Sequence, residues 1–112
     1  MAAFLKFDSF AEALAEKAHN IGSDVLKVAL TNSAPSAANT VLANITQIAP
    51  GNGYVAGGNQ ATQVSSSQTA GTYKLVLNDP TFIAAGGAIA PFRYACLYND
   101  TALNDELIGW GD

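Results

Sequence analysis

A β-strand followed by a turn is predicted in the segment Ser23-Asp-Val-Leu-Lys-Val-Ala-Leu-Thr-Asn-Ser-Ala-Pro35. Leu26, Val28 and Leu30 alternate with other residues, which is the period-two pattern of a half-buried strand. The residues from Asn32 onward then predict a turn, because Asn, Ser and Pro favour turn conformations. A short apolar run closed by such residues is typical of a small antiparallel β unit.

Two later runs repeat this pattern, namely Gly71-Thr-Tyr-Lys-Leu-Val-Leu-Asn-Asp-Pro80 and Pro91-Phe-Arg-Tyr-Ala-Cys-Leu-Tyr-Asn-Asp100. The first predicts a strand with Tyr73, Leu75 and Leu77 on one face, ended by Asn-Asp-Pro. The second predicts a strand with apolar side chains on both faces. Together the three runs predict a small antiparallel β unit.

A short helix is predicted before the first strand. Ser9-Phe-Ala-Glu12 fits a capping box, in which the Ser hydroxyl and the Glu carboxylate each satisfy a backbone N–H at a helix start. The helix is expected to run from about residue 9 to residue 20 and to stop at Gly22, which favours a left-handed C-terminal residue. Its apolar stripe at helical spacing consists of Phe7, Phe10, Leu14 and Ile21.

The middle of the chain is rich in residues that favour loops. Leu42, Ile45 and Ile48 recur every three residues, which predicts a short helix or a tight irregular turn. Residues 49–59 are rich in Gly and Asn, which tolerate positive φ, so a long exposed loop is expected. Residues 60–68 are polar and Ser-rich, and they predict a marginal edge strand or an extended arm that a partner orders.

Two further β elements are predicted toward the end of the chain. Residues 81–89 predict a hairpin about Gly86-Gly87, because a Gly-Gly pair suits the turns that match the twist of paired strands. Leu107-Ile-Gly-Trp110 predicts a last strand. Because only two residues follow it, we expect this strand at the edge of a sheet, where other chains add on.

The order of these elements predicts a single domain. A chain of 112 residues is long enough to bury its own core, and no linker or internal repeat divides it. Residues 1–112 are therefore expected to form one domain. The expected fold class is α+β, mainly β, with one N-terminal helix and a small antiparallel β sandwich or barrel.

Charged residues are scarce in this chain. They make up 12% of it, against roughly 25% in an average soluble domain, so small neutral residues must cover much of the surface. Burying such residues against another protein avoids the cost of desolvating charges. The composition therefore favours a protein that makes extensive protein contacts.

The charge and hydropathy patterns argue against two classes of partner. Nucleic acid is not expected, because the net charge is −4 and the five basic residues are scattered, whereas phosphate binding needs clustered Lys or Arg. A membrane is not expected either, because no apolar run approaches the roughly 20 residues that span a bilayer. The first residues lack the pattern of a secretory signal, so synthesis in a cytoplasm is expected.

No constellation of residues predicts an enzyme, and neither a cofactor nor a metal ion is expected. A zinc site needs three or four His, Cys or acidic ligands, whereas the chain has one histidine, His19, and one cysteine, Cys96, in an apolar run typical of a buried, inert thiol. Ser65-Ser-Ser67 lacks the nucleophile elbow of hydrolases. Gly51-Asn-Gly-Tyr-Val-Ala56 matches a dinucleotide-binding pattern, but Gly57-Gly58 breaks the helix that must follow it.

The residues expected at a protein interface lie near the termini and in the Gly-rich loop, where large amphipathic rings often anchor contacts. They are Phe4, Phe7, Asn52, Tyr54 and Trp110. Tyr54 is the preferred candidate, because it lies among glycines in the exposed loop. Burial in the core is the alternative interpretation of Phe7.

Four parts of this sequence resemble a family of small virion proteins of tailed bacteriophages. They are Leu26-Lys-Val-Ala-Leu-Thr-Asn-Ser-Ala-Pro35, Pro50-Gly-Asn-Gly-Tyr-Val-Ala-Gly-Gly58, Gly71-Thr-Tyr-Lys-Leu75, and Pro91-Phe-Arg-Tyr94 with Leu97-Tyr-Asn-Asp100. The resemblance covers most of the chain, including His19-Asn20 and Ile108-Gly109-Trp110. None of these runs is a catalytic motif.

The resemblance implies a virion component without fixing its place in the particle, and the best match is a head decoration protein, also called a cement protein. Such a protein binds the major capsid protein on the outer head surface and stabilises contacts between capsomers. The resemblance also implies a trimer at local threefold positions and a final location on the capsid surface of the virion. Family members continue past the Ile-Gly-Trp element with further strand sequence, so a strand borrowed from a neighbouring copy is one expected way to complete the sheet. The alternative is a tail or receptor-binding component, a recognition module whose Gly/Asn-rich loop contacts the host.

Overall fold

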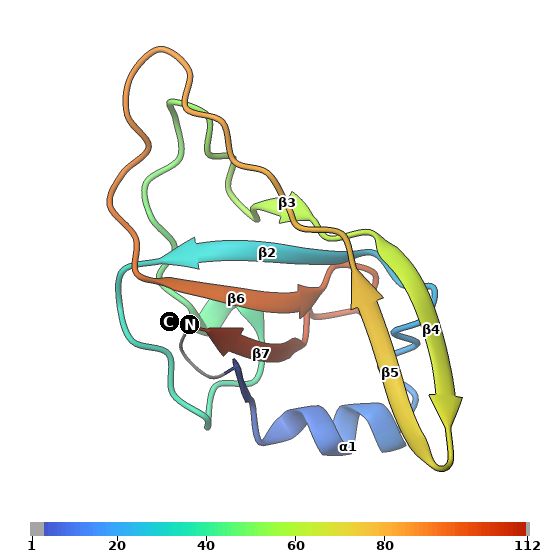
Figure 1. Ribbon diagram of the computed structural model, residues 1–112. Coiled ribbons are helices and arrows are strands. Elements are labelled where there is room, and N and C mark those ends of the chain that lie inside the picture. The colour runs from blue at the N-terminus through green and yellow to red at the C-terminus, as the bar shows by residue number, and fades with distance from the viewer. Residues whose placement is uncertain (1–3, 112) are drawn as a thin grey trace.

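The fold is built on antiparallel strands with one α-helix near the N-terminus (Figure 1). The computed structural model describes residues 4–111. The elements in chain order are β1 Phe4–Lys6, α1 Ser9–Ala15, β2 Leu26–Thr31, the 3-10 helix η1 Leu42–Asn44, β3 Asn59–Gln60, β4 Gln63–Thr69, β5 Thr72–Leu77, β6 Tyr94–Asn99 and β7 Leu107–Gly111. The strands form one sheet of five and one of two, which confirms the predicted α+β, mainly β class.

The pairing of β2 with β6 forms the centre of the larger sheet. The strand order is β1-β7-β6-β2-β3, and β2 and β6 pair from Leu26 opposite Asn99 to Thr31 opposite Tyr94. The end strands β1 and β3 do not pair with each other, so the sheet is open and does not close into a barrel. The smaller sheet is the hairpin of β4 and β5.

The main core lies on one face of the five-stranded sheet. Alternation along the strands places Ala29 of β2 and Cys96 of β6 directly opposite each other, and both are fully buried. The rings of Phe7 and Trp110 pack against each other with 4.5 Å between their centroids. The whole cluster comprises Phe7, Ala29, Ile45, Cys96, Tyr98, Leu107 and Trp110.

A smaller core cluster is formed by Leu30, Ile48 and Tyr54, with Phe82 and Ile89 packed against it. Leu30 follows Ala29 in β2 and therefore points to the opposite face of the sheet. Strand β2 is thus buried on both faces at its C-terminal end, although the alternation in the sequence predicted a half-buried strand. Loops, and not a second layer of strands, cover this second face.

The helix is shorter than expected. It ends at Ala15, and the chain leaves it through Lys17, whose φ is 67°, so the predicted stop at Gly22 is wrong. The predicted capping box is also wrong, because Asp8 at the N-cap already has helical dihedral angles and no side-chain cap hydrogen bond forms. The Asp8 N–H instead donates to the Ala37 carbonyl at 2.9 Å. A tertiary contact therefore determines where the helix begins.

Strand β7 is not the edge strand that was expected. It lies between β6 and β1, with Leu5 of β1 opposite Trp110. Strand β1 is absent from the sequence-based predictions, because three residues are too few to display an alternation. Since β1 covers β7, the edge of the sheet on this side belongs to residues 4–6.

Residues 81–89 do not form the predicted hairpin. Gly86 and Gly87 do have positive φ values, 77° and 156°, but residues 78–93 contain no strand. The segment bonds to another loop instead, with the Ala85 N–H donating to the Asn52 carbonyl at 2.9 Å. Loop-to-loop hydrogen bonds thus replace the strand pairing that the Gly-Gly pair predicted.

Truncating a core leucine is expected to be far more damaging than truncating an exposed one. Leu107 is 0% exposed and Leu103 is 95% exposed. We expect Leu107→Ala to lower the free energy of unfolding by about 2–5 kcal/mol, because it leaves a cavity. The control Leu103→Ala is expected to change it by less than about 0.5 kcal/mol. Urea unfolding followed by tryptophan fluorescence measures both, and equal losses would contradict this description of the core.

Candidate functional site

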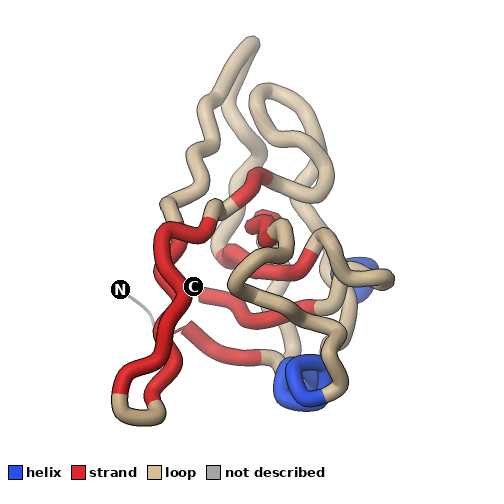
Figure 2. The backbone as a smooth tube through the Cα atoms, turned by 90° about the vertical axis from the view of Figure 1, so that its right-hand side faces the viewer, coloured by secondary structure: helices blue, strands red, loops and turns tan. Residues whose placement is uncertain are grey.

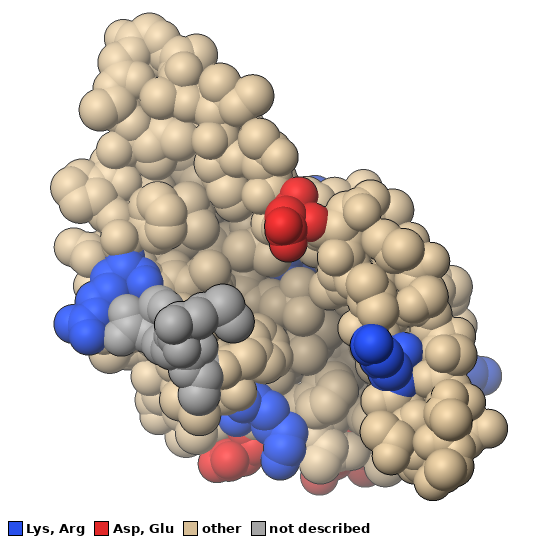
Figure 3. Space-filling model, in the orientation of Figure 1, with Lys and Arg blue, Asp and Glu red and all other residues tan. Residues whose placement is uncertain are grey.

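A projection without charged side chains rises from one end of the sheet (Figures 1 and 2). It consists of two loops, residues 49–58 and 80–92, which we call the projection. Neither loop contains Asp, Glu, Lys, Arg or His, and in the space-filling view this end of the molecule has no charged groups (Figure 3). An uncharged surface that stands out from the body is suited to burial against another protein.

Asn52 joins the two loops of the projection. The side-chain Nδ2 of Asn52 donates to the Ala88 carbonyl at 3.1 Å, and the backbone carbonyl of Asn52 accepts from the Ala85 N–H at 2.9 Å. Gly53 then passes so close to the other loop that a Cβ there would lie 2.0 Å from the Ile83 carbonyl oxygen. Because only glycine fits this contact, the sequence allows the two loops to pack in this arrangement.

Tyr54 anchors the projection to the sheet. Its hydroxyl donates to Gln47 Oε1 at 2.6 Å and accepts from the Leu30 backbone N–H at 3.1 Å. Strand β2 pairs with β3 only at Lys27 and Val28, so beyond that point the Tyr54 hydroxyl takes the place of a strand partner. Burial raises the pKa of Tyr54 above its ordinary value, which keeps the hydroxyl protonated and able to donate.

The projection exposes apolar side chains above a packed base. Phe82 stacks on Tyr54 with 5.9 Å between ring centroids. Val55 and Ile83 are 66% and 72% exposed. Since hydrogen bonds and the ring stack already order the loops, a partner that covers these two side chains has little further chain to order.

The β4–β5 hairpin is the second exposed feature (Figure 1). Every residue from Val64 to Lys74 is exposed, and a two-stranded hairpin is only marginally stable by itself. Gln63 fastens the base of the hairpin to the rest of the chain, because its Nε2 donates to the backbone carbonyls of Ile21 at 3.0 Å and Asp24 at 2.6 Å. Strand β4 has one edge without a strand partner, and no charged residue or proline within β4 blocks that edge.

The structure divides the five expected interface residues into two groups. Phe7, Tyr54 and Trp110 are 0%, 2% and 9% exposed. Their expected role as contact rings is therefore corrected, because their apolar surfaces are already packed inside this chain. Phe4 is 56% exposed at the sheet, and Asn52 is exposed in the projection. These two remain available to a partner.

Two exposed residues of the projection, Val55 and Ile83, are missing from the expected set. The sequence does not show whether an apolar residue in a loop is buried or exposed. Only the packing of the folded loops decides this. The signal in the sequence was the lack of charge in both loops. That signal marks the surface but not the side chains that are exposed on it.

Asn99 organises the buried polar groups near the helix. Its Oδ1 accepts from the backbone N–H groups of Thr101 and Ala102 at 3.0 Å and 3.1 Å, so its Nδ2 faces the other way. This Nδ2 donates to His19 Nδ1 at 3.0 Å and to Asp24 Oδ2 at 2.6 Å. His19 Nδ1 is therefore an acceptor, and the neutral ring carries its proton on Nε2.

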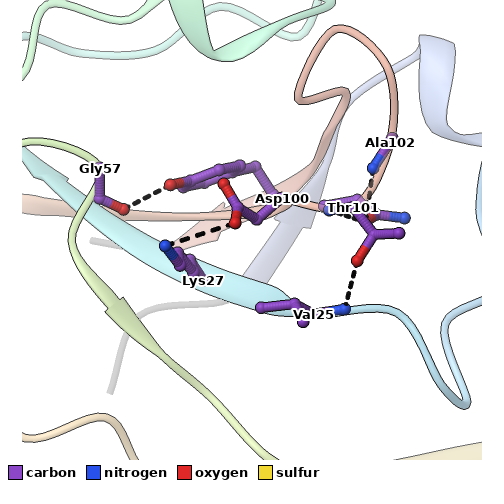
Figure 4. A network of polar contacts seen from close by, with 8 residues as sticks. Val25, Lys27, Gly57, Asp100, Thr101 and Ala102 are labelled. Atoms are coloured by element: carbon purple, nitrogen blue, oxygen red, sulfur yellow. Dashed lines mark hydrogen bonds and ion pairs between the residues drawn. The ribbon is translucent and has the colours of Figure 1, made fainter.

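A neighbouring set of polar contacts fastens the turn after β6 to β2 (Figure 4). Thr101 Oγ1 accepts from the Val25 N–H at 2.8 Å, and Lys27 forms an ion pair with Asp100 at 3.4 Å. The two charged side chains are 33% and 38% exposed, and solvent-screened pairs of this kind contribute little to stability. These contacts hold the turn after β6 against β2, so we assign them a structural role.

Reactive groups are few among residues 4–111. This part of the chain holds no group of three or more His, Cys, Asp or Glu side chains placed to share a metal ion. Cys96 is buried, and burial raises the pKa of its thiol to about 11, so little nucleophilic thiolate forms near neutral pH. Burial and the carboxylates of Asp100 and Glu106 raise the pKa of Asp105. The projection and the hairpin are our candidate functional surfaces, because they are the two exposed features described above.

No protein-family model, curated protein or solved structure matches the chain. Within the described residues, no helix has both the length and the apolar character needed to span a bilayer.

Lowering the pH is expected to destabilise the fold through His19. Burial lowers the pKa of His19 below its ordinary value of 6.5, and Glu106 and Asp24 oppose the shift. The unfolded chain therefore binds a proton near pH 6.5 that the folded chain excludes, so stability is present above that pH and falls as the pH drops below it. We expect a fall of up to about 1.4 kcal/mol per pH unit.

Urea unfolding at about pH 7.5 and about pH 5.5 measures this fall. The variant His19→Gln keeps an acceptor for Asn99 and does not titrate in this range. Its stability is expected to change less between the two pH values than that of the wild-type protein. Equal changes in both proteins would assign the pH dependence to another group.

Replacing Asn52 is expected to loosen the projection. Asn52→Ala removes the hydrogen bond to Ala88 and also places alanine at a φ of 54°, a conformation that costs alanine about 1 kcal/mol. Asn52→Gly removes only the hydrogen bond, because glycine adopts this φ freely. Limited proteolysis with thermolysin should cleave residues 80–92 fastest in Asn52→Ala, more slowly in Asn52→Gly and slowest in the wild type. Identical rates in all three would mean that Asn52 does not hold the loops together.

Proposed function

We propose that this protein is a virion structural component of a tailed bacteriophage. In this proposal it is a head decoration protein that binds the major capsid protein on the outer head surface as a trimer and stabilises contacts between capsomers. The proposal is supported by the sequence resemblance and by the uncharged exposed surfaces of the projection and of strand β4. Its location in this proposal is the capsid surface, after synthesis in the host cytoplasm.

The absence of charged side chains on the projection and on strand β4 is the observation that carries the proposal. No charged side chain lies between Lys27 and Lys74, or between Asp79 and Arg93. These stretches include β4 and the whole projection. Burying an unpaired charge costs several kcal/mol, and a neutral surface of small residues avoids that cost each time a copy binds. A protein that covers a repeating shell needs this property at every contact.

Strand addition along β4 supplies the proposed capsid contact. The turn after β4 contains two residues, Ala70 and Gly71, with φ values of 52° and 84°, and Thr69 pairs with Thr72 across it. A two-residue turn makes the flanking residues a hydrogen-bonded pair, so the alternation directs the N–H of Gln68 toward the free edge. A strand of the capsid protein lying along this edge receives hydrogen bonds from alternate residues of β4.

Additive binding is the mechanism of stabilisation in this proposal. A single added strand contributes modest affinity, because each hydrogen bond nets only about 1 kcal/mol in water. A trimer holds three such hairpins, and once the first is bound the others bind at a high effective concentration. Hairpins that reach different capsomers then resist their separation.

Mixing the purified protein with expanded heads that lack decoration tests the proposal. We expect the wild type to co-sediment with the heads. Gln68→Pro removes the outward N–H without breaking a bond to β5, so it is expected to bind about three- to tenfold more weakly. Gln68→Ala loses the same side chain but keeps the N–H, and it is expected to bind like the wild type.

Two outcomes would reject the head assignment. If the wild-type protein binds purified tails but not heads, it is a tail or receptor-binding component. If it binds neither and sediments as an inert monomer, the virion proposal is wrong. Equal binding by Gln68→Pro and Gln68→Ala would retain the function but reject β4 as the contact.

A further inference from the structure

The tip of the loop at residues 49–58 is a two-residue turn made of Asn52 and Gly53. Gly51 and Tyr54 flank the turn and bond to each other, because the Gly51 N–H donates to the Tyr54 carbonyl at 2.7 Å and the Tyr54 N–H donates to the Gly51 carbonyl at 3.1 Å. Asn52 and Gly53 have φ values of 54° and 107°. Positive φ at both central residues favours Asn-Gly in such turns.

Gly53 cannot be exchanged for a residue with a side chain. A Cβ at this position would lie 2.0 Å from the Ile83 carbonyl oxygen, so any side chain would drive the two loops of the projection apart. Asn52 is the only asparagine in the chain that glycine follows. The packing of the projection therefore requires a glycine directly after Asn52.

An asparagine followed by glycine is prone to deamidation. In this reaction the backbone nitrogen of the next residue loses its proton to hydroxide and attacks the side-chain Cγ. A cyclic imide forms, and the amide nitrogen takes a proton from water and leaves as ammonia. Water then opens the imide, giving aspartate when the bond to Cγ breaks and isoaspartate when the bond to the backbone carbonyl carbon breaks. Glycine favours the attack, because it has no Cβ to crowd the nitrogen.

The structure exposes the reacting groups of this pair but restrains the side chain. Asn52 and Gly53 are both exposed, so hydroxide and water reach them. No hydrogen bond to the Gly53 N–H forms within residues 4–111, so loss of its proton breaks no contact there. The Asn52 side chain is held by its bond to the Ala88 carbonyl. Ring closure needs that side chain to rotate toward the Gly53 nitrogen, so the attack waits for a local opening of the projection.

Asn52 also carries the hydrogen bonds between the two loops. Within residues 4–111 both bonds that join residues 49–58 to residues 80–92 involve it, one through its side chain to Ala88 and one through its backbone carbonyl from Ala85. The second loop is packed against the same side chain, because a Cβ at Gly87 would lie 3.1 Å from Asn52 Cγ. A chemical change at this one residue therefore alters the whole junction.

We propose that Asn52 is a modification site, at which spontaneous deamidation releases the two loops of the projection from each other. In either product the Nδ2 donor is lost, so the Ala88 carbonyl loses its partner, and the new carboxylate cannot donate in its place. Isoaspartate also routes the backbone through the side chain and lengthens the turn. The carboxylate is the first charge in either loop. The proposal is independent of the virion assignment, because the reaction needs only water and this turn.

Peptide mapping of aged protein tests whether the reaction occurs at this site. Trypsin releases residues 28–74 as one peptide, because no Lys or Arg lies between Lys27 and Lys74, and tandem mass spectrometry locates each deamidated residue in it. Asn32 in the same peptide is exposed and precedes serine, so it is the internal control.

After incubation in mildly alkaline buffer, we expect deamidation at Asn52 to exceed that at Asn32 severalfold. Unfolding in guanidinium chloride is expected to accelerate the reaction at Asn52, because the turn and the bond to Ala88 no longer restrain the side chain. Equal deamidation at Asn52 and Asn32 in the folded protein would overturn the proposal. An unchanged rate at Asn52 in guanidinium chloride would show that the projection does not restrain this residue, and it would overturn the proposal as well.

The variant Asn52→Asp tests the effect on the loops without ageing. Aspartate matches asparagine in size and tolerates positive φ, so the variant differs from the wild type in the lost donor and the added charge. We expect thermolysin to cleave residues 80–92 about fivefold faster in Asn52→Asp than in fresh wild type. The matched control Asn32→Asp adds the same charge outside the projection and is expected to be cleaved like the wild type. Equal cleavage of the two variants would overturn the release of the loops.

Discussion

The second edge of strand β2 is the constraint from which the exposed architecture follows. One edge of β2 is paired in full with β6, but the other pairs with β3 at only two residues. Beyond that point the Leu30 N–H donates to the Tyr54 hydroxyl, and the Leu30 carbonyl accepts from the Ile48 N–H at 3.0 Å. Thr31 makes an isolated bridge with Gln47. Loops therefore satisfy the backbone groups that a neighbouring strand would satisfy in a larger sheet.

This substitution explains why the projection is both irregular and ordered. A strand at this edge would have extended the sheet, whereas the Tyr54 side chain bonds to β2 and lets its own loop leave the sheet. Gln47 Oε1 accepts from the Tyr54 hydroxyl and also from the Gly57 N–H at 2.7 Å. One side chain thus holds the loop at both Tyr54 and Gly57. Asn52 then joins the second loop to the first.

The scarcity of charge connects the fold to the proposed function. The two exposed features have different shapes, one a pair of loops and the other a hairpin, but the projection and strand β4 of the hairpin both lack charged side chains. The hairpin offers backbone donors and acceptors along an edge, whereas the projection offers apolar side chains.

The sequence patterns correctly predicted those strands and helices whose conformation depends mainly on neighbouring residues in the chain. Strands β2, β5 and β6 lie within one or two residues of the predicted runs, because alternation of apolar residues is a local property. The 3-10 helix at Leu42–Asn44 also lies where the three-residue spacing indicated a short helix or tight turn. The Gly-rich loop was recognised from residues that tolerate positive φ.

Features that depend on contacts between distant residues were not predictable in this way. The early end of the helix, the position of β7 inside the sheet and the loop at residues 81–89 all follow from partners that are far away in the sequence. The candidate site shows the same division. The sequence by itself determined that the surface has little charge and that the chain has an exposed Gly-rich loop. Only the tertiary structure decided that Tyr54 is buried while Ile83 and Phe4 are exposed, because burial depends on which side chains the folded chain brings together.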